Sequence, residues 1–227
     1  MNYRDTRDYE NLQKVIYPGV GQFCTPQMYP LRASDFHVDN WISFNFMRTC
    51  EEPEKHGVHF FIDDYQFLRV WKQPDAYISK LSQFQAVCTP DFSLYTDFPN
   101  VIQHYNHYRK HWIGRYWQSL GVRMIPTVGW SDHSSYDWCF DGDPVRGVVA
   151  VSSVGTQASK TTAALFHDGW VEMLKRLDPE LIVFYGNLPD YAAEERSRIV
   201  HVPAFAKKWK PEMETALERS LRNDEDG

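Results

Sequence analysis

The sequence has few cysteines and no long apolar run. No stretch approaches the roughly 18 apolar residues that a membrane-spanning helix needs, and residues 1–13 lack the apolar centre of a signal peptide. The four cysteines are far apart and form no CxxC pair: Cys24, Cys50, Cys88 and Cys139. We therefore expect reduced thiols in a cytoplasmic protein, with no membrane partner, rather than a zinc knuckle or a disulfide framework.

The sequence also lacks the short motifs of several large enzyme classes. It has no Walker sequence and no GxGxxG turn, which argues against P-loop NTPases and dinucleotide-binding domains. No GxSxG segment provides a nucleophile elbow, and no HExxH segment provides a zinc protease site. Any reaction must therefore be sought in residues that are distant in the sequence.

Composition indicates an ordinary globular protein. The chain has 227 residues, with 43% hydrophobic and 24% charged residues, and 15% are aromatic. Lys and Arg number 24 against 30 Asp and Glu, a net charge of −6, which argues against a protein that coats DNA by neutralising phosphates. The length suits one domain. We expect a single α/β domain over residues 1–227, with an irregular N-terminal arm (1–40), an α/β core (41–205) and a C-terminal helix with a charged tail (206–227).

Short apolar runs alternate with segments of helical length. The runs predict strands at 41–46, 59–62, 86–89, 123–128, 148–152, 181–185 and 199–202. The intervening patterns predict helices at 64–71, 74–84, 99–120 and 158–177. This alternation predicts a mostly parallel sheet. An open doubly wound sheet and an incomplete (β/α) barrel both fit, and we favour the barrel because no glycine-rich fingerprint turn dominates.

The predicted helix at 99–120 has two distinct features. Its aromatic stripe is expected to face the core: Val101, Tyr105, Tyr108, Trp112 and Tyr116. On its flank, three histidines fall within one arc: His104, His107 and His111. These three histidines could share a zinc ion. The simpler interpretation is that they form an edge of the helix that faces solvent or substrate, next to the positively charged Arg109, Lys110 and Arg115. With its aromatics and cations, this helix is also the best candidate for contact with a phosphate backbone.

Several blocks between residues 61 and 185 carry a family resemblance. They include 90–95 (PDFSLY), 114–118 (GRYWQ), 125–132 (IPTVGWSD), 152–155 (SSVG) and 184–186 (FYG). With these blocks the chain resembles a family known as a domain of unknown function, found in bacteria, phages and other mobile elements. The resemblance assigns no activity and no catalytic residue.

Acidic residues follow three of the predicted strands. In parallel α/β folds, the carboxyl ends of the strands meet at one edge, here called the strand-end rim, and functional groups gather there. Asp64, Asp91 and Asp132 are therefore candidates for general acid–base roles or for binding Mg²⁺. The alternative is that each carboxylate caps the helix that follows it.

The remaining candidates are substrate-binding residues on the same rim, except for Arg115, which belongs to the helix predicted at 99–120. The segment Ser152–Thr156 precedes the helix at 158–177, where its backbone N–H groups could hold an anion or only cap the helix. Trp130 is expected to wall the pocket. The full set is Ser93, Arg115, Trp130, Ser131, Ser152, Ser153, Gly155, Thr156 and Asn187.

These residues support a first hypothesis and an alternative. The first is a hydrolase-like enzyme that binds a small anionic or phosphate-bearing substrate at the strand-end rim, with Mg²⁺ as the possible cofactor. The alternative is a non-catalytic module that binds nucleic acid or a host protein during phage or plasmid replication.

Overall fold

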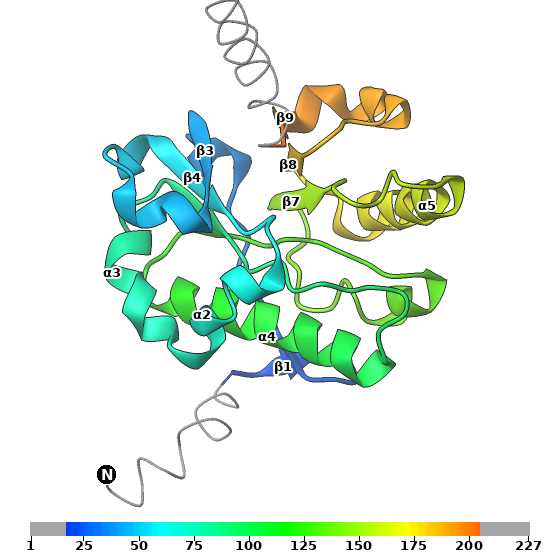
Figure 1. The fold of residues 1–227 in the computed structure, drawn as a ribbon, viewed down its shortest axis with the longest axis horizontal. Helices are drawn as coiled ribbons and strands as arrows, with labels where there is room; N and C mark the ends of the chain where they lie inside the picture. The colour runs from blue at the N-terminus through cyan, green and yellow to red at the C-terminus, as the bar shows by residue number, and fades with distance from the viewer. Residues whose placement is uncertain (1–16, 205–227) are drawn as a thin grey trace, which may run out of the picture.

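The computed structural model describes residues 17–204, and these form an α/β fold with parallel strands (Figure 1). The predicted C-terminal helix and charged tail lie outside the described residues, as do residues 1–16. The fold class predicted from the sequence is confirmed in this coarse form.

The parallel strands follow one another in space in the order in which they occur in the chain. The first sheet contains β3 (Asn40–Ser43), β4 (His56–His59), β5 (Ala86–Cys88) and β6 (Met124–Ile125), and the second contains β7 (Val148–Ser152), β8 (Leu181–Tyr185) and β9 (Ile199–Val202). A parallel bridge between Thr127 and Ala150 joins the two sheets. Among strands of the described region, β9 does not pair with β3, so they do not form a closed barrel, and the barrel prediction is not confirmed.

Two long helices cover the sheets, α4 (Asn100–Ser119) and α5 (Lys160–Leu177). In Figure 1, α4 runs below the β3–β6 half, and α5 lies beside β7 and β8. The shorter helices are η3 (Ala33–Asp35), η4 (Phe44–Thr49), η5 (Pro53–Lys55), η6 (Asp64–Gln66), α2 (Arg69–Lys72), η7 (Pro74–Tyr77), α3 (Ile78–Leu81), η8 (His133–Asp137) and η9 (Asp190–Arg198).

Some predicted boundaries are wrong for local reasons. In place of each helix predicted at 64–71 and 74–84 the structure has two short helices, η6 and α2 and then η7 and α3. The two pairs are separated where Gln73 leaves the helical region (φ −136°, ψ 62°) and Pro74 starts a new turn. The strand predicted at 59–62 ends at His59. Phe60 and Phe61 continue beyond the strand and are both buried.

Buried side chains form clusters on the two faces of the strands. One face of β4, β5 and β6 packs with α2, α3 and α4, and the same face of β7 and β8 packs on α5. The opposite face of both sheets shares one cluster, in which Ala86, Ile125, Val148, Val183 and Val202 belong to five successive strands. Because this cluster contains residues of both sheets, it fixes the position of the strands of one sheet relative to those of the other.

The N-terminal arm is more ordered than predicted. Residues Gly19–Val20 (β1) and Thr25–Pro26 (β2) pair as a short antiparallel hairpin. Further along, the backbone N–H of Tyr29 donates to Oε1 of Gln118 (3.0 Å), and Nε2 of Gln118 donates to the Tyr29 carbonyl (2.8 Å). These two hydrogen bonds fix the arm against α4.

The buried face of α4 is polar, so the predicted apolar stripe is wrong for part of its length. Val101 is 70% exposed and Tyr105 is 44% exposed, whereas Trp112 is buried. The buried positions of the helix are mainly polar: Gln103, Asn106, His107, Lys110 and His111, followed by Ile113, Gly114 and Trp117. Their spacing of three and four residues is helical, but the stripe lies on another side of the helix than the aromatic residues predict.

Five buried polar side chains of α4 each contact an oxygen atom in a loop or in the helix, whereas Nδ1 of His107 and Nε1 of Trp112 have no partner in the described residues. Gln103 donates to the Phe98 carbonyl (2.9 Å), and Asn106 donates to the Ser93 carbonyl (2.7 Å). Burial lowers the pKa of His107 well below its ordinary value, and its ring lies 2.9 Å from the Asp141 carbonyl. Buried polar groups without such partners would destabilise the fold.

His111 and Asp143 form a fully buried pair. Nε2 of His111 lies 2.9 Å from Oδ1 of Asp143, and Nδ1 lies 3.0 Å from the His107 carbonyl. Both side chains are 0% exposed. The pair joins α4 to the loop after η8, which also contacts the N-terminal arm through a hydrogen bond from the Met28 N–H to the Gly142 carbonyl (2.9 Å).

No helix within residues 17–204 is long and apolar enough to span a bilayer.

Removing one member of the buried pair tests this account of the fold. Asp143→Ala leaves Nε2 of His111 without its partner in a site closed to water. We expect the free energy of unfolding to fall by about 3–5 kcal/mol, measured by urea denaturation. The matched control, Asp137→Ala, changes an exposed aspartate on η8 and should alter stability by less than about 0.5 kcal/mol. Equal effects of the two substitutions would contradict the assigned role of the pair.

Candidate functional site

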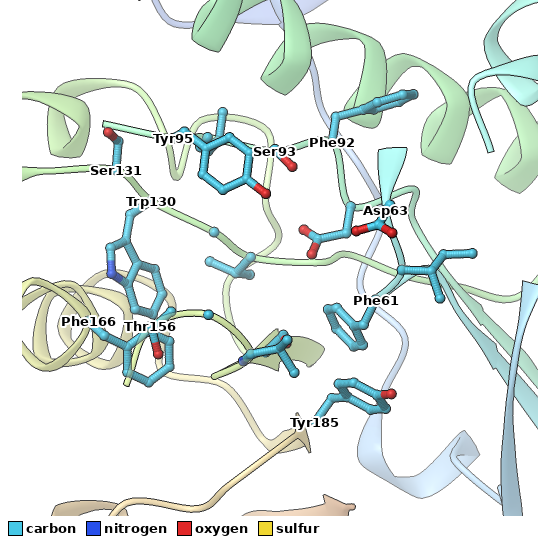
Figure 2. A pocket seen from close by; sticks show the side chains of 18 of the residues that line it. Phe61, Asp63, Phe92, Ser93, Tyr95, Trp130, Ser131, Thr156, Phe166 and Tyr185 are labelled. Atoms are coloured by element: carbon cyan, nitrogen blue, oxygen red, sulfur yellow. The ribbon is translucent and has the colours of Figure 1, made fainter. Parts of the chain in front are cut away.

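A cavity of about 630 Å³ opens beside the carboxyl ends of the strands (Figure 2). Its walls come from the segments after β4, β5, β6 and β7, from the end of β8 and from the first half of α5. Seven of the predicted site residues line it: Asp91, Ser93, Trp130, Ser131, Ser152, Gly155 and Thr156. The cavity volume falls in the range of small-molecule sites.

Asp64 lies directly behind this wall and fixes its geometry. Its carboxylate accepts hydrogen bonds from the Ser93 hydroxyl (2.8 Å) and from the Ser93 backbone N–H (3.2 Å). The guanidinium of Arg109 lies 4.0 Å away. Asp64 therefore ties the segment after β4 to the segment after β5, and it is neither a helix cap nor a residue that lines the cavity.

Asp91 is the carboxyl group best suited to proton transfer. Burial raises its pKa from 3.8 to about 6, and the nearby charge of Asp64 adds to this effect, whereas the Lys110 ammonium opposes it. No hydrogen bond to its carboxyl group is found within the described residues. A carboxyl group with a pKa near 6 exchanges protons close to neutral pH, as general acids and bases must.

Lys110 brings a buried positive charge to the same cavity. The residue is 3% exposed, yet it lies in the cavity wall, and its Nζ donates to the Thr127 carbonyl (2.7 Å). An ammonium group has three N–H donors. Within residues 17–204, no protein acceptor is found for the other two. They are available to a ligand oxygen in the cavity.

Thr127 itself belongs to a reciprocal contact between strand ends. Its backbone N–H donates to Oγ1 of Thr89 (2.8 Å), and its hydroxyl donates to the Thr89 carbonyl (2.9 Å). Both threonines are buried. This contact continues the pairing of β5 and β6 and fixes the carbonyl that holds Lys110.

Trp130 forms one wall of the cavity because α5 leaves room for its ring. Its indole N–H donates to the Leu165 carbonyl (3.2 Å), and the ring packs on Phe166 with centroids 5.2 Å apart. A Cβ atom at Gly169 would lie 2.1 Å from Nε1 of Trp130. Only glycine at this helical position allows the indole to approach the helix so closely.

The segment after β7 turns at Gly155 and carries hydroxyl groups. Gly155 has φ +79°, and a Cβ atom there would contact nothing within 4 Å. Ser152 accepts a hydrogen bond from the Val154 N–H (3.2 Å), and Thr156 donates to the Ser153 carbonyl (2.8 Å). Across the cavity edge, the Ser131 side-chain oxygen is buried and has no partner in the described part of the chain. These groups give one side of the cavity a polar character.

Four other predicted site residues lie outside the cavity wall. Asp132 caps η8 by accepting from the Ser134 N–H (2.9 Å). The Ser153 hydroxyl donates to the Asn187 carbonyl (2.7 Å) and ties together the loops after β7 and β8, which is a structural role. Arg115 donates to the Tyr29 hydroxyl (3.0 Å) and lies over that ring. The predicted rim therefore forms only in part.

The cations and histidines of α4 are largely occupied within the protein. Arg109 has a side chain 11% exposed and stacks on Phe92 with a distance of 3.6 Å to the ring centroid. His104 stacks on Phe23 (3.8 Å), whereas His107 and His111 are buried. No cluster of three potential metal-binding side chains is found in residues 17–204.

Other cavity residues were not expected from the sequence. Phe61 and Tyr185 stack at 5.0 Å on the side opposite Trp130, and Asp63 points toward the cavity (Figure 2). Phe166 and Lys110 come from the two long helices, α5 and α4. The strand-end rule also points to Asp63, which follows the predicted strand at 59–62, and to Tyr185, which ends the predicted strand at 181–185. The buried polar spacing of α4 was the available signal for Lys110.

Comparison with known proteins agrees with the resemblance carried by the sequence blocks. The model of a family described as Domain of unknown function (DUF4417) matches residues 18–203. The Gene 1 protein of Mycobacterium phage L5 is 41% identical over 184 residues, which cover 79% of this chain and 80% of that protein. The Gene 1 protein of Mycobacterium phage D29 is 40% identical over 177 residues, 77% of this chain and 64% of that protein. No solved structure matches the chain.

Gly169→Ala tests the placement of Trp130. In an unobstructed helix this change raises stability by about 0.5–1 kcal/mol, but here the added methyl group collides with the indole. We expect a loss of about 1–3 kcal/mol and a shift of the tryptophan fluorescence maximum. In the double variant Gly169→Ala/Trp130→Leu the clash is removed, so alanine should again be neutral or stabilising. A stabilising effect of Gly169→Ala alone would contradict the packing.

The raised pKa of Asp91 predicts a pH-dependent effect on stability. The folded state holds the Asp91 proton more tightly than the unfolded state, so stability decreases as pH rises from 3.8 to about 6. At about 1.4 kcal/mol per pKa unit, the penalty above pH 6 is at most about 3 kcal/mol. Asp91→Asn should therefore be more stable than the wild type at pH 8, with the difference vanishing toward pH 4, in urea unfolding experiments. Asp35→Asn, at an exposed aspartate, should show no such trend.

Proposed function

We propose that this chain, which belongs to the family described as Domain of unknown function (DUF4417), is a hydrolase-like enzyme that acts on a small phosphate-bearing substrate. The family description gives no reaction, so the proposal rests on the cavity. The observation that carries the proposal is the placement of Asp91 and Lys110 in one cavity wall. A proton-exchanging carboxyl group can activate a water molecule, and a buried ammonium can bind the anion and stabilise its developing charge.

Asp91 is the proposed general base. With a pKa of about 6 it is mostly ionised at neutral pH and can take a proton from an attacking water molecule. Its role predicts that activity increases as pH rises through about 6. Asp64 and Ser93 position the segment that carries Asp91, through the hydrogen bonds between them.

Lys110 is the proposed anion-binding residue, together with the hydroxyl group of Ser152. The ammonium is held by the Thr127 carbonyl, so it is already oriented before a ligand arrives. A preoriented charge stabilises the developing negative charge without the cost of rearrangement. In this proposal Lys110 takes the role that the sequence suggested for Arg115.

Mg²⁺ remains the proposed cofactor. Asp63 is exposed and lines the cavity, and its carboxylate oxygens are donors that Mg²⁺ prefers. Magnesium in phosphate-handling enzymes is commonly held by one or two carboxylates together with the phosphate oxygens of the substrate. The ion would offset substrate charge next to Asp63 and Asp91.

We expect cleavage of phosphate esters that depends on Asp91. The assay uses p-nitrophenyl phosphate and bis(p-nitrophenyl) phosphate, each with and without Mg²⁺, over pH 5–9. Asp91→Asn should lower kcat at least 100-fold, since general-base catalysis contributes about 10²–10⁴-fold, and the pH profile of the wild type should rise through about 6.

The control is Asp35→Asn, which should leave kcat and the pH profile unchanged. Two results would contradict the proposal. One is the absence of phosphate-ester cleavage by the wild-type protein in every condition. The other is activity that persists, with its pH profile intact, in the Asp91→Asn variant.

A further inference from the structure

The aromatic side chains of the cavity are arranged in two facing groups. Trp130 and Phe166 lie on one side, and Phe61 and Tyr185 lie on the other (Figure 2). Within each group the rings are close to parallel, with interplanar angles of 31° and 22°. A bare phosphate ester makes no use of either group.

The orientation of both walls is fixed by contacts outside the cavity. On one side, the indole of Trp130 is held by the Leu165 carbonyl and by the space at Gly169. On the other, Tyr185 contacts His59 at 4.5 Å, and His59 is buried. Burial lowers the pKa of His59 to about 3, so its ring is neutral and packs as an aromatic group. Rigid walls with fixed faces favour a flat ligand, because stacking needs no rearrangement.

Polar groups between the two walls suit the edges of such a ligand. Ser131 lies in the cavity wall, and its side-chain oxygen is buried without a partner in the part of the chain that the structure describes. At Gly129 a Cβ atom would contact nothing within 4 Å, so the backbone there is open to the cavity. A buried hydroxyl without a partner is destabilising until a ligand supplies one.

From these features we infer that the substrate is a nucleotide. Its base would lie between the aromatic walls with one edge on Ser131, and its phosphate would contact Lys110. The cavity of about 630 Å³ is large enough for a ligand of this size. This inference rests on the proposed function, since it takes a phosphate group in the cavity as given and adds the ring that accompanies it.

Isothermal titration with matched ligands separates the contributions of the ring and the phosphate. The probes are the four nucleoside 5′-monophosphates, ribose 5-phosphate, which lacks the base, and adenosine, which lacks the phosphate. We expect at least one nucleotide to bind tenfold or more tightly than ribose 5-phosphate, since stacking of one base contributes roughly five- to 150-fold in affinity. The same nucleotide should bind more tightly than its nucleoside.

Two substitutions at Trp130 assign the ring contact. Trp130→Leu should remove most of the difference in affinity between the nucleotide and ribose 5-phosphate. Trp130→Phe keeps an aromatic face, and its affinity for the nucleotide should stay within about threefold of the wild type.

Lys110→Gln tests the phosphate contact. It should weaken nucleotide binding at least tenfold while leaving adenosine binding unaffected, and Lys175→Gln, at an exposed lysine on α5, is the matched control. The melting temperature of each variant reports whether it is folded. If Lys110→Gln does not fold, the Trp130 pair decides the inference.

The outcomes distinguish the two proposals. Equal binding of nucleotides and ribose 5-phosphate would overturn the nucleotide inference and leave a phosphate-ester enzyme. Equal binding of adenosine and AMP would overturn the role of the phosphate in both proposals. No binding by any of these probes would overturn both.

Discussion

The structure depends on the burial of polar groups along one face of α4. Five side chains of that face, Gln103, Asn106, His107, Lys110 and His111, contact loop or helix oxygen atoms, and together they hold the segments that follow β5, β6 and η8. A polar group buried without a hydrogen-bond partner destabilises the fold by more than a paired group stabilises it. Each contact therefore restricts where its loop can lie. The cavity beside the strand ends is a consequence of this restriction.

The same arrangement separates structural from chemical roles among residues that look alike in the sequence. Asp64 and Asp132 accept hydrogen bonds from neighbouring serines, and Oδ1 of Asp143 lies 2.9 Å from Nε2 of His111. Asp91 faces the cavity, with burial raising its pKa to about 6. Lys110 and Arg115 differ in the same way, since one lies in the cavity wall and the other stacks on Tyr29. Residues of the same charge therefore differ in whether they reach the cavity.

The strand order also has a consequence for the site. The seven parallel strands follow chain order through the bridge at Thr127 and Ala150, so their carboxyl ends lie along one edge. This edge brings the segments after β4, β5, β6 and β7 to one cavity although they span residues 61–156 of the chain. Sequential parallel strands of this kind offer a continuous row of loops for ligand contacts. Neither an open sheet with a reversal of strand order nor a closed barrel is needed for this effect.

Sequence alone determined the α/β class, the positions of the seven strands within a few residues, both long helices, the family resemblance and seven residues of the cavity wall. These follow from local rules, because hydrophobic periodicity and turn residues act over a few positions and parallel strands share one edge. Tertiary structure decided which side of α4 is buried and that Lys110 reaches the cavity. The reason is that a polar side chain is buried only where distant segments supply its partner, and nothing in the local sequence specifies that partner.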